Sequence, residues 1–200
     1  MKREIPVGWI IASIANNELS KIIQPGIQKF KSKNYLATAN VINSEICDGD
    51  WVTYENRETR ANMQPIINSV WFAKMKASCK HITITQKDKW FTDKYVLSTG
   101  FLGLECTIDS LAFMRQLIYS KQFEIKKDTI SHGNTQQAVN NDDLYGIKFT
   151  QPTLSVLHRF SQLLNPMLEM ITECIKSNQD LISMKNYLLP LLINGQVKVL

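Results

Sequence analysis

The chain has 200 residues, of which 44% are hydrophobic and 20% charged, a composition typical of a folded protein with one domain or one domain plus an appendage. The formal net charge of +5 and the pI near 9.0 are compatible with an anionic partner such as nucleic acid but do not require one. No segment approaches the roughly 20 consecutive apolar residues of a membrane span, so we expect no membrane partner.

The N-terminus places Lys2 and Arg3 before a short apolar run, as a signal peptide would. Glu4, Pro6 and Gly8 interrupt that run, which is too short for the core of a signal peptide. We therefore expect a cytoplasmic protein whose four cysteines are free thiols.

Runs rich in β-branched and aromatic residues predict a series of short strands in the first part of the chain. The predicted strands are Tyr35–Ile42, Trp51–Tyr54, Ser69–Met75, His81–Thr85 and Tyr95–Ser98. Asp48-Gly49-Asp50 predicts a turn between the first two strands. We interpret Gly100–Gly103 as a turn next to a strand.

A short helix is predicted after these strands. With Asp109 as its N-cap, the helix would run to about Phe123 and place Leu111, Met114 and Leu117 on one face.

The β-rich region closes with a polar loop at 131–141, a last strand at Leu144–Phe149 and Pro152. From Thr153 to Leu192 the apolar residues instead recur with alternating spacings of four and three. We therefore predict an α+β fold in two parts. A β-rich domain would cover residues 1–151, and a long, coiled-coil-like helical region would cover residues 152–200.

The helical region carries a heptad-like seam. Its apolar members are Leu157, Phe160, Leu164, Met167, Ile171, Cys174, Leu181, Leu188 and Leu192. Asn178 and Lys185 are polar interruptions of the seam. A single helix cannot bury such a stripe, so we expect it to pack on its own domain or on a second copy. Pro166 should kink or break the helix near Asn165, and Asn194-Gly195 should end it.

Positive charge concentrates in the β-rich region, where residues 57–94 hold eight basic and three acidic side chains. Lysines can anchor phosphates, and Arg, Asn and Gln can read base edges. The candidate DNA-contacting residues are Lys29, Lys31, Lys33, Tyr54, Arg57, Arg60, Asn62, Gln64, Lys74, Lys76 and Lys80. On charge alone, an ordinary solvated surface explains these residues as well.

Motifs for cofactors and metals are missing from the sequence. It holds no glycine-rich phosphate loop, and no cysteine or histidine stands at metal-ligand spacing. The sequence also has no N-P-P-[YF] segment of the kind that holds a flipped adenine, and Asn165-Pro166-Met167 matches it only weakly. A methyltransferase is therefore disfavoured. We expect no cofactor and no metal.

One arrangement resembles a metal-dependent nuclease, in which Asp109 and Glu124 would hold Mg²⁺ and Lys126 would position water. That pattern needs its E-x-K segment on a strand beside the aspartate. Here the segment between them is predicted to be a helix that Asp109 caps.

A set of short motifs runs in order along the whole chain. Ile5–Trp9 fits P-x-G-W, and Gly133–Val139 fits G-x-T-[QM]-x-x-[IV]. Leu188–Val197 closely resembles LLP-x-L-[LM]-[SN]-G-[EQ]-[IV], with isoleucine at the [LM] position. The other matches are Tyr35–Val41, Thr59–Ala61, Val70–Met75, Leu97–Phe101 and Gln151–Thr153. In number and order these motifs resemble the DNA specificity subunits of type I restriction-modification systems. Asn68-Ser69 departs from the Gly-Asp that the family carries before its equivalent of Val70.

The resemblance implies a division of labour between the two parts of the chain. Residues 1–151 would be a target-recognition domain that reads about half of a split site in double-stranded DNA. The helix would pair antiparallel with a second such helix and dock methyltransferase subunits. Full-length members carry two domains and two helices, so one of each implies a homodimer or pairing with another half-subunit. Methylation and cleavage would come from other subunits, so the chain itself would not be an enzyme.

Two other functions stay open on the residues alone. One is the small Mg²⁺-dependent nuclease that uses Asp109, Glu124 and Lys126. The other is a protein-binding module whose basic face is incidental.

Overall fold

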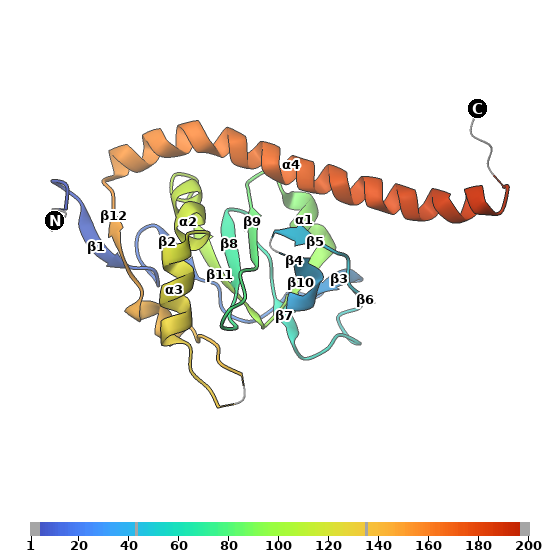
Figure 1. Cartoon of the computed structure of the whole chain (residues 1–200), viewed down its shortest axis with the longest axis horizontal. Coiled ribbons are helices and arrows are strands. Elements are labelled where there is room, and N and C mark those ends of the chain that lie inside the picture. The colour runs from blue at the N-terminus through green and yellow to red at the C-terminus, as the bar shows by residue number, and fades with distance from the viewer. Residues whose placement is uncertain (1–4, 43, 135, 197–200) are drawn as a thin grey trace.

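Two four-stranded sheets form the centre of the computed structural model, which describes residues 5–42, 44–134 and 136–196 (Figure 1). The first is antiparallel, with the order β2 (Ser20–Ile22), β11 (Phe101–Cys106), β8 (Ser69–Ala73) and β9 (His81–Ile84). The second has the order β6 (Trp51–Val52), β3 (Lys33–Leu36), β10 (Tyr95–Ser98) and β7 (Ala61–Met63). β3 and β10 pair in parallel, and the other neighbours pair antiparallel.

Two short strand pairs and four helices surround these sheets (Figure 1). The pairs are β1 (Ile10–Ser13) with β12 (Lys148–Gln151), and β4 (Val41–Ile42) with β5 (Glu45–Ile46). The helices are α1 (Lys89–Lys94), α2 (Leu111–Ile118), α3 (Lys121–Ile130) and α4 (Leu154–Ile193). Two 3-10 turns are η1 (Thr38–Asn40) and η2 (Asp142–Gly146). This architecture confirms the predicted α+β class, with a long helix after a β-rich region.

The interpretation of Gly100–Gly103 as a turn is right for Gly100, which lies in the turn after β10, and wrong for Phe101–Gly103, which belong to β11. β11 is an inner strand of the first sheet, paired with β2 on one side and β8 on the other. Gly103 stands in it because the Trp71 ring covers its backbone, and a Cβ there would lie 2.6 Å from ring atoms. A glycine inside a strand often marks such a close approach, and in the sequence it resembles a turn signal.

Strand β10 has its predicted bounds, and β6, β8 and β9 begin as predicted but end one or two residues early. The other two predicted strands are wrong in extent. The run predicted as Tyr35–Ile42 is interrupted by η1, because Asn40 Oδ1 accepts a hydrogen bond from the Ala37 N–H at 3.0 Å. Such local side-chain bonding competes with a strand ladder. The last strand was predicted at Leu144–Phe149, but Leu144 belongs to η2 and β12 begins only at Lys148.

The single helix predicted from Asp109 to Phe123 is two helices. Ser120 separates them: its Oγ accepts from the Phe123 N–H at 3.2 Å and so caps α3. Ser110, not Asp109, occupies the N-cap position of α2. The Asp109 carboxylate instead bonds to His158 Nδ1 at 3.0 Å and Ser161 Oγ at 3.2 Å, which ties α2 to α4.

Helix α4 lies along one edge of the domain and extends past it (Figure 1). The predicted break at Pro166 does not occur, and α4 runs unbroken from Leu154 to Ile193. Packing holds this stretch together, because Asn165 Nδ2 donates to the Ile108 carbonyl at 3.0 Å and Leu168 is buried. The predicted end is confirmed: Gly195, at φ +66°, follows the helix. Among the described residues, none of the helices combines the length and apolarity of a membrane span.

A few predicted features lie outside the described residues. They are Lys2 and Arg3 of the signal-like N-terminus, Thr135 in the Gly133–Val139 motif and Val197 in the last motif.

Candidate nucleic-acid interface

Basic side chains from separate segments gather around the turn between β10 and β11. Gly100 in that turn accepts a backbone hydrogen bond from the Lys74 N–H at 2.9 Å. The side chains of Thr38 and Arg60 lie over Gly100, within 3.4 Å of where a Cβ would stand. Lys80 Nζ donates to the Thr38 carbonyl at 2.5 Å. We call Arg60, Lys74, Lys76 and Lys80 the basic rim.

The segment around residues 131–139 completes the rim. Lys76 Nζ donates to Gln137 Oε1 at 2.7 Å, and the Val139 N–H donates to the Lys74 carbonyl at 3.0 Å. Gly133 adopts φ +127°, and a Cβ there would lie 2.5 Å from the Gln136 carbonyl oxygen. Glycine is therefore required at the start of this motif.

The charged groups of the rim form no ion pairs within the part of the chain that the structure describes. Among the residues that the structure describes, no rim residue forms an ion pair, whereas Lys87 pairs with Glu169 at 2.7 Å and Lys94 with Asp48 at 2.9 Å. Burial lowers the pKa of Lys74, a half-buried member of the rim. Cations held together without counter-ions favour an anionic partner such as a phosphate backbone.

A polar hollow of about 510 Å³ opens beside Arg60. Asn40, Asp50 and Glu58 contribute to its walls, and η1 supplies one side. Amide and carboxylate groups can bond to base edges. Sequence reasoning missed this hollow, because Asn40 was assigned to a strand and acidic side chains were not among the candidate DNA-contacting residues.

The remaining candidates form a second group on the neighbouring loops. The Arg57 guanidinium stacks over the Tyr54 ring, with 4.1 Å between its Cζ and the ring centroid. Lys29 and Lys31 are exposed on the loop that precedes β3. Lys33 Nζ instead donates to the Thr92 carbonyl beside α1. Burial lowers the pKa of Lys33, against the opposing effect of the Asp93 charge.

Strand β7 joins the two groups. Its Asn62 and the following Gln64 are half-buried. The Asn62 carbonyl accepts from the Gly26 N–H at 2.8 Å on the loop side, while Ala61 pairs with Ser98 of β10 on the rim side. The structure thus brings Arg60, Lys74, Lys76 and Lys80 together and leaves Lys29, Lys31, Lys33, Tyr54 and Arg57 apart from them.

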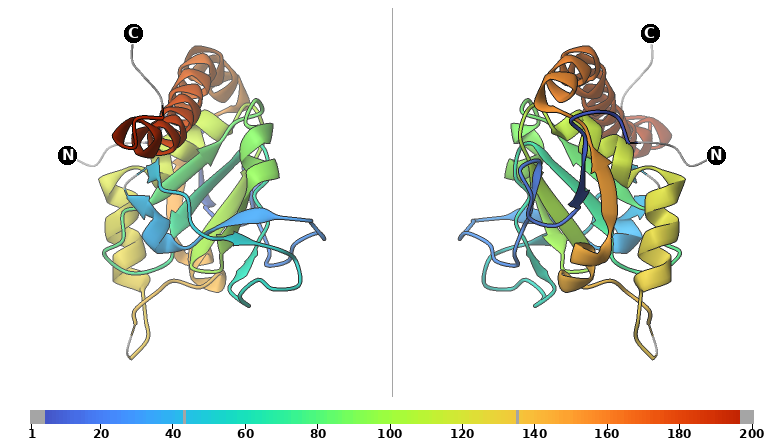
Figure 2. Two further views of the ribbon diagram at one scale, coloured as in Figure 1. Left: turned by 90° about the vertical axis from the view of Figure 1, so that its right-hand side faces the viewer. Right: turned by 90° about the vertical axis from the view of Figure 1, so that its left-hand side faces the viewer.

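The rim lies on the opposite edge of the domain from α4. Strand β10 crosses the domain from one edge to the other: the Tyr95 hydroxyl bonds to Gln179 Oε1 of α4 at 3.0 Å, and the strand ends next to the rim turn. Figure 2 shows the segments 131–134 and 136–139 projecting from the edge that faces away from α4. A partner bound at the rim therefore leaves α4 uncovered.

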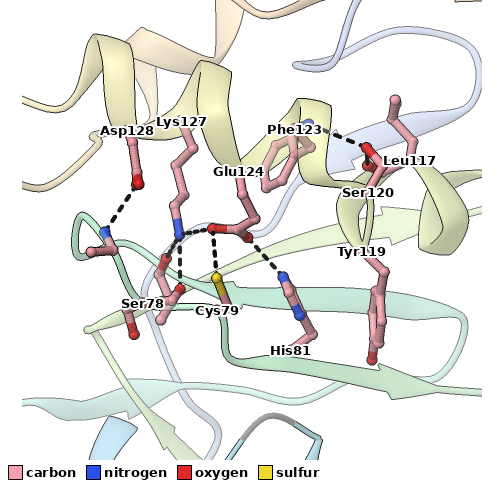
Figure 3. A network of polar contacts seen from close by, with 12 residues as sticks. Ser78, Cys79, His81, Leu117, Tyr119, Ser120, Phe123, Glu124, Lys127 and Asp128 are labelled. Atoms are coloured by element: carbon pink, nitrogen blue, oxygen red, sulfur yellow. Dashed lines mark hydrogen bonds and ion pairs between the residues drawn. The ribbon is translucent and has the colours of Figure 1, made fainter.

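A buried polar cluster on α3 supports the segment that carries the rim lysines (Figure 3). Glu124 bonds to His81 Nε2 at 2.8 Å and to Lys127 Nζ at 2.7 Å. Lys127 Nζ also donates to the Ser78 carbonyl at 2.8 Å, in the turn between β8 and β9. Burial raises the pKa of Glu124, but the hydrogen bonds and charges of His81 and Lys127 outweigh it and hold this pKa below its ordinary value.

The three residues of the proposed nuclease arrangement each contact different partners, and they do not form one site. Asp109 bonds to α4, Glu124 bonds to His81 and Lys127, and Lys126 Nζ donates to the Lys148 carbonyl at 2.7 Å. The E-x-K segment lies on helix α3, not on a strand. The described residues contain no group of three His, Cys, Asp or Glu side chains placed to hold a metal.

The predicted seam of α4 divides into a buried and an exposed part. Leu157 is 1% exposed and belongs to the domain's own core, and Phe160 packs at its edge, 6.4 Å from Phe113 between ring centroids. Leu164 and Leu188 are half-buried. The exposed members are Met167, Ile171, Cys174, Leu181 and Leu192.

A scan against protein-family models finds no match, and a search of the curated proteins finds no match either. Solved structures do match. A chain of a type I R-M system, studied for its complex assembly and conformational transition, is 16% identical with a TM-score of 0.64, over 98% of this chain and 51% of that one. The HsdS subunit from Thermoanaerobacter tengcongensis is 16% identical with a TM-score of 0.62, over 94% and 49%.

This chain therefore spans about half the length of both structures. The likeness covers the β-rich domain and α4 together, in agreement with motifs that run along the whole chain. The chain has the fold of the HsdS specificity subunits of type I restriction-modification systems, over about half of their length.

Proposed function

We propose that this chain is a DNA specificity subunit of a type I restriction-modification complex and carries no catalytic site of its own. Residues 1–151 form the domain that reads one half of a bipartite site in double-stranded DNA. Residues 152–200 form the helical part that pairs with a second copy and docks methyltransferase subunits. The HsdS-like fold supports the class, and the unpaired rim on the edge opposite α4 supports the DNA-reading role.

The basic rim is the observation that carries this proposal. Arg60 precedes β7, and Lys74 and Lys80 lie in the connection between β8 and β9. The two segments surround one turn, and none of these three residues forms an ion pair among the described residues. A protein-binding module with an incidental charge has no need of this arrangement. Its separation from α4 lets one subunit hold DNA on one edge and protein partners on the other.

The phosphate-contacting role of the rim predicts a change in salt dependence. Replacing Lys74 and Lys80 together by alanine should reduce the slope of log K against log salt concentration by about 1.8, because each neutralised phosphate accounts for about 0.9 of that slope. The matched control replaces Lys87 and Lys89, which pair with Glu169 and Asp93 elsewhere on the domain. Fluorescence anisotropy with a labelled duplex measures both slopes. Equal slopes for the two double variants would rule out phosphate binding by the rim.

Arg60 is the rim residue expected to read a base. Arg60 lines the polar hollow, and its guanidinium lies over Gly100 in the turn that the rim surrounds. Arginine can form two hydrogen bonds to the edge of a guanine. Arg60→Ala should weaken binding to the preferred sequence by about 1–3 kcal/mol and relax one base position. A uniform loss over all sequences would assign Arg60 to phosphate binding instead.

A further inference from the structure

The connection between β8 and β9 carries the three lysines of the basic rim and contains a strained turn. The turn runs from Met75 to Ser78, and the Ser78 N–H closes it by donating to the Met75 carbonyl at 3.3 Å. Ala77, the third residue of the turn, has φ +57°. This left-handed conformation favours glycine, because it crowds the Cβ of any other residue. Such a residue keeps its conformation where surrounding contacts hold it, and residues of this kind are common at binding sites.

Two consecutive residues of α3 make contacts that hold the turn (Figure 3). Asp128 Oδ1 accepts a hydrogen bond from the Ala77 N–H at 3.0 Å. Lys127 Nζ donates to the Ser78 carbonyl at 2.8 Å and to the Ala73 carbonyl at 3.4 Å. Helix α3 therefore holds the strained residue through Asp128 and the residue after it through Lys127.

The segment that follows α3 holds the other side of the same connection. The Lys76 N–H donates to the Gln137 carbonyl at 2.9 Å, and the Lys76 ammonium donates to Gln137 Oε1 at 2.7 Å. The Val139 N–H donates to the Lys74 carbonyl at 3.0 Å. The rim lysines are thus set between α3 on one side and residues 136–139 on the other.

Asp128 places a carboxylate beside a surface that we propose for phosphates. It is half-buried, and within the described part of the chain it forms no ion pair with a lysine of the rim. By charge alone, a carboxylate at this place weakens the binding of DNA phosphates. Its hydrogen bond to Ala77 instead keeps the turn between the lysines in shape. These two effects on DNA binding have opposite signs, so an experiment can separate them.

We propose that Asp128 is a positioning residue for DNA binding, which acts by holding Ala77 in its left-handed conformation. With the turn fixed, Lys76 and the lysines at the two ends of the connection are in place before DNA arrives. Groups that are already in place lose less conformational freedom on binding. This inference rests on the DNA-binding role proposed above. It adds the element of the fold that sets the rim, which is helix α3.

Substitutions at Asp128 separate its position from its charge. Asp128→Ala removes the acceptor and should raise the dissociation constant for a labelled duplex at least fivefold, although it also removes a charge that repels phosphates. Asp128→Asn removes the charge but keeps an oxygen that can accept from the Ala77 N–H, so it should bind as tightly as the unmodified chain or more tightly. Fluorescence anisotropy measures each constant. Unchanged or tighter binding by Asp128→Ala would overturn the proposal.

Asp142→Ala is the matched control for the charge. Asp142 is an exposed acid at the start of η2, and its removal should not weaken DNA binding. Loss of affinity equal to that of Asp128→Ala would mean that any change of an acid on this domain weakens binding, and it would overturn the specific role of Asp128.

Salt dependence distinguishes a displaced lysine from a partly unfolded chain. A smaller folded fraction lowers the apparent affinity but leaves the slope of log K against log salt concentration unchanged. Loss of one phosphate contact lowers that slope by about 0.9. We expect the lower slope for Asp128→Ala and the unmodified slope for Asp128→Asn. An unmodified slope for Asp128→Ala would contradict a positioning role.

Substitutions at Ala77 test the turn without any change of charge. Ala77 is exposed, so neither variant disturbs the core. Ala77→Gly suits φ +57° and should leave the dissociation constant within twofold of the unmodified value. Ala77→Val should raise it at least fivefold, because a β-branched residue is strongly disfavoured at positive φ. Equal constants for these two variants would overturn the role of the turn and leave DNA binding itself intact. An unmodified chain that binds no duplex would overturn the proposed function and this inference with it.

Discussion

Replacing Glu124 by alanine is expected to lower the free energy of unfolding by about 3 kcal/mol, because the Lys127 ammonium then stays buried without an opposite charge. The Lys127 side chain is fully buried, and the carbonyls of Ser78 and Ala73 that remain beside it carry no net charge. Denaturant unfolding followed by circular dichroism measures the change. The matched control is Lys126→Ala, an exposed neighbour on α3, which should cost less than about 0.5 kcal/mol.

The same cluster predicts a loss of stability in acid. The pKa of Glu124 is lowered in the folded chain, so its contribution is fully present above the ordinary glutamate value of about 4.3. That contribution is lost as the pH falls below this value and through the lowered folded pKa. Glu124→Gln should remove this part of the pH dependence. An acid unfolding profile identical to that of the unmodified chain would show that Glu124 is not charged in the fold.

Replacing both Ile171 and Leu181 by aspartate is expected to convert the proposed dimer into a monomer. Both side chains are exposed, at 44% and 62%, so the single chain tolerates the charges. In the dimer both positions would lie in the paired seam, and four carboxylates would lose water without a partner. The dissociation constant should rise at least 100-fold, which corresponds to about 2.7 kcal/mol. Light scattering over a range of concentrations measures it.

Lys176→Asp is the control for this double variant. It changes the net charge by the same two units, and by helical period Lys176 lies on the side of α4 turned away from the seam. It should leave the dimer unchanged, and equal dissociation by both variants would point to net charge alone. Removing α4 by truncation after Pro152 is a less specific test, because Leu157 and Leu168 would leave the domain's core.

Local sequence patterns predicted the parts of the fold that local chemistry determines. The period of the apolar residues located α4, and β-branched and aromatic residues located β10. Patterns were misleading where a tertiary contact decides the outcome. Gly103 lies inside β11 because Trp71 packs over it. Pro166 lies within α4 because the domain holds the helix on both sides of it.

The sequence predicted which residues could contact DNA, but it did not predict which of them lie together on one surface. The sequence named Arg60, Lys74 and Lys80, yet only the fold shows that the segment before β7 and the β8–β9 connection meet at the β10–β11 turn. It named Lys33 in the same set, although its side chain bonds to the backbone beside α1. The polar hollow at Asn40 depends on the 3-10 turn η1. The alternation of polar and apolar residues that predicted a strand here cannot reveal such a turn.

The central claim is that this chain reads DNA sequence as one of two copies related by a two-fold axis. Selection from random double-stranded DNA with the purified full chain, followed by sequencing of the bound fraction, tests it most directly. We expect enrichment of one short sequence and its inverted repeat, separated by a fixed gap that the length of the paired helices sets. Recovery of unenriched DNA, or no retention of DNA at low salt, would contradict a specificity subunit and leave α4 as the surface of a protein-binding module.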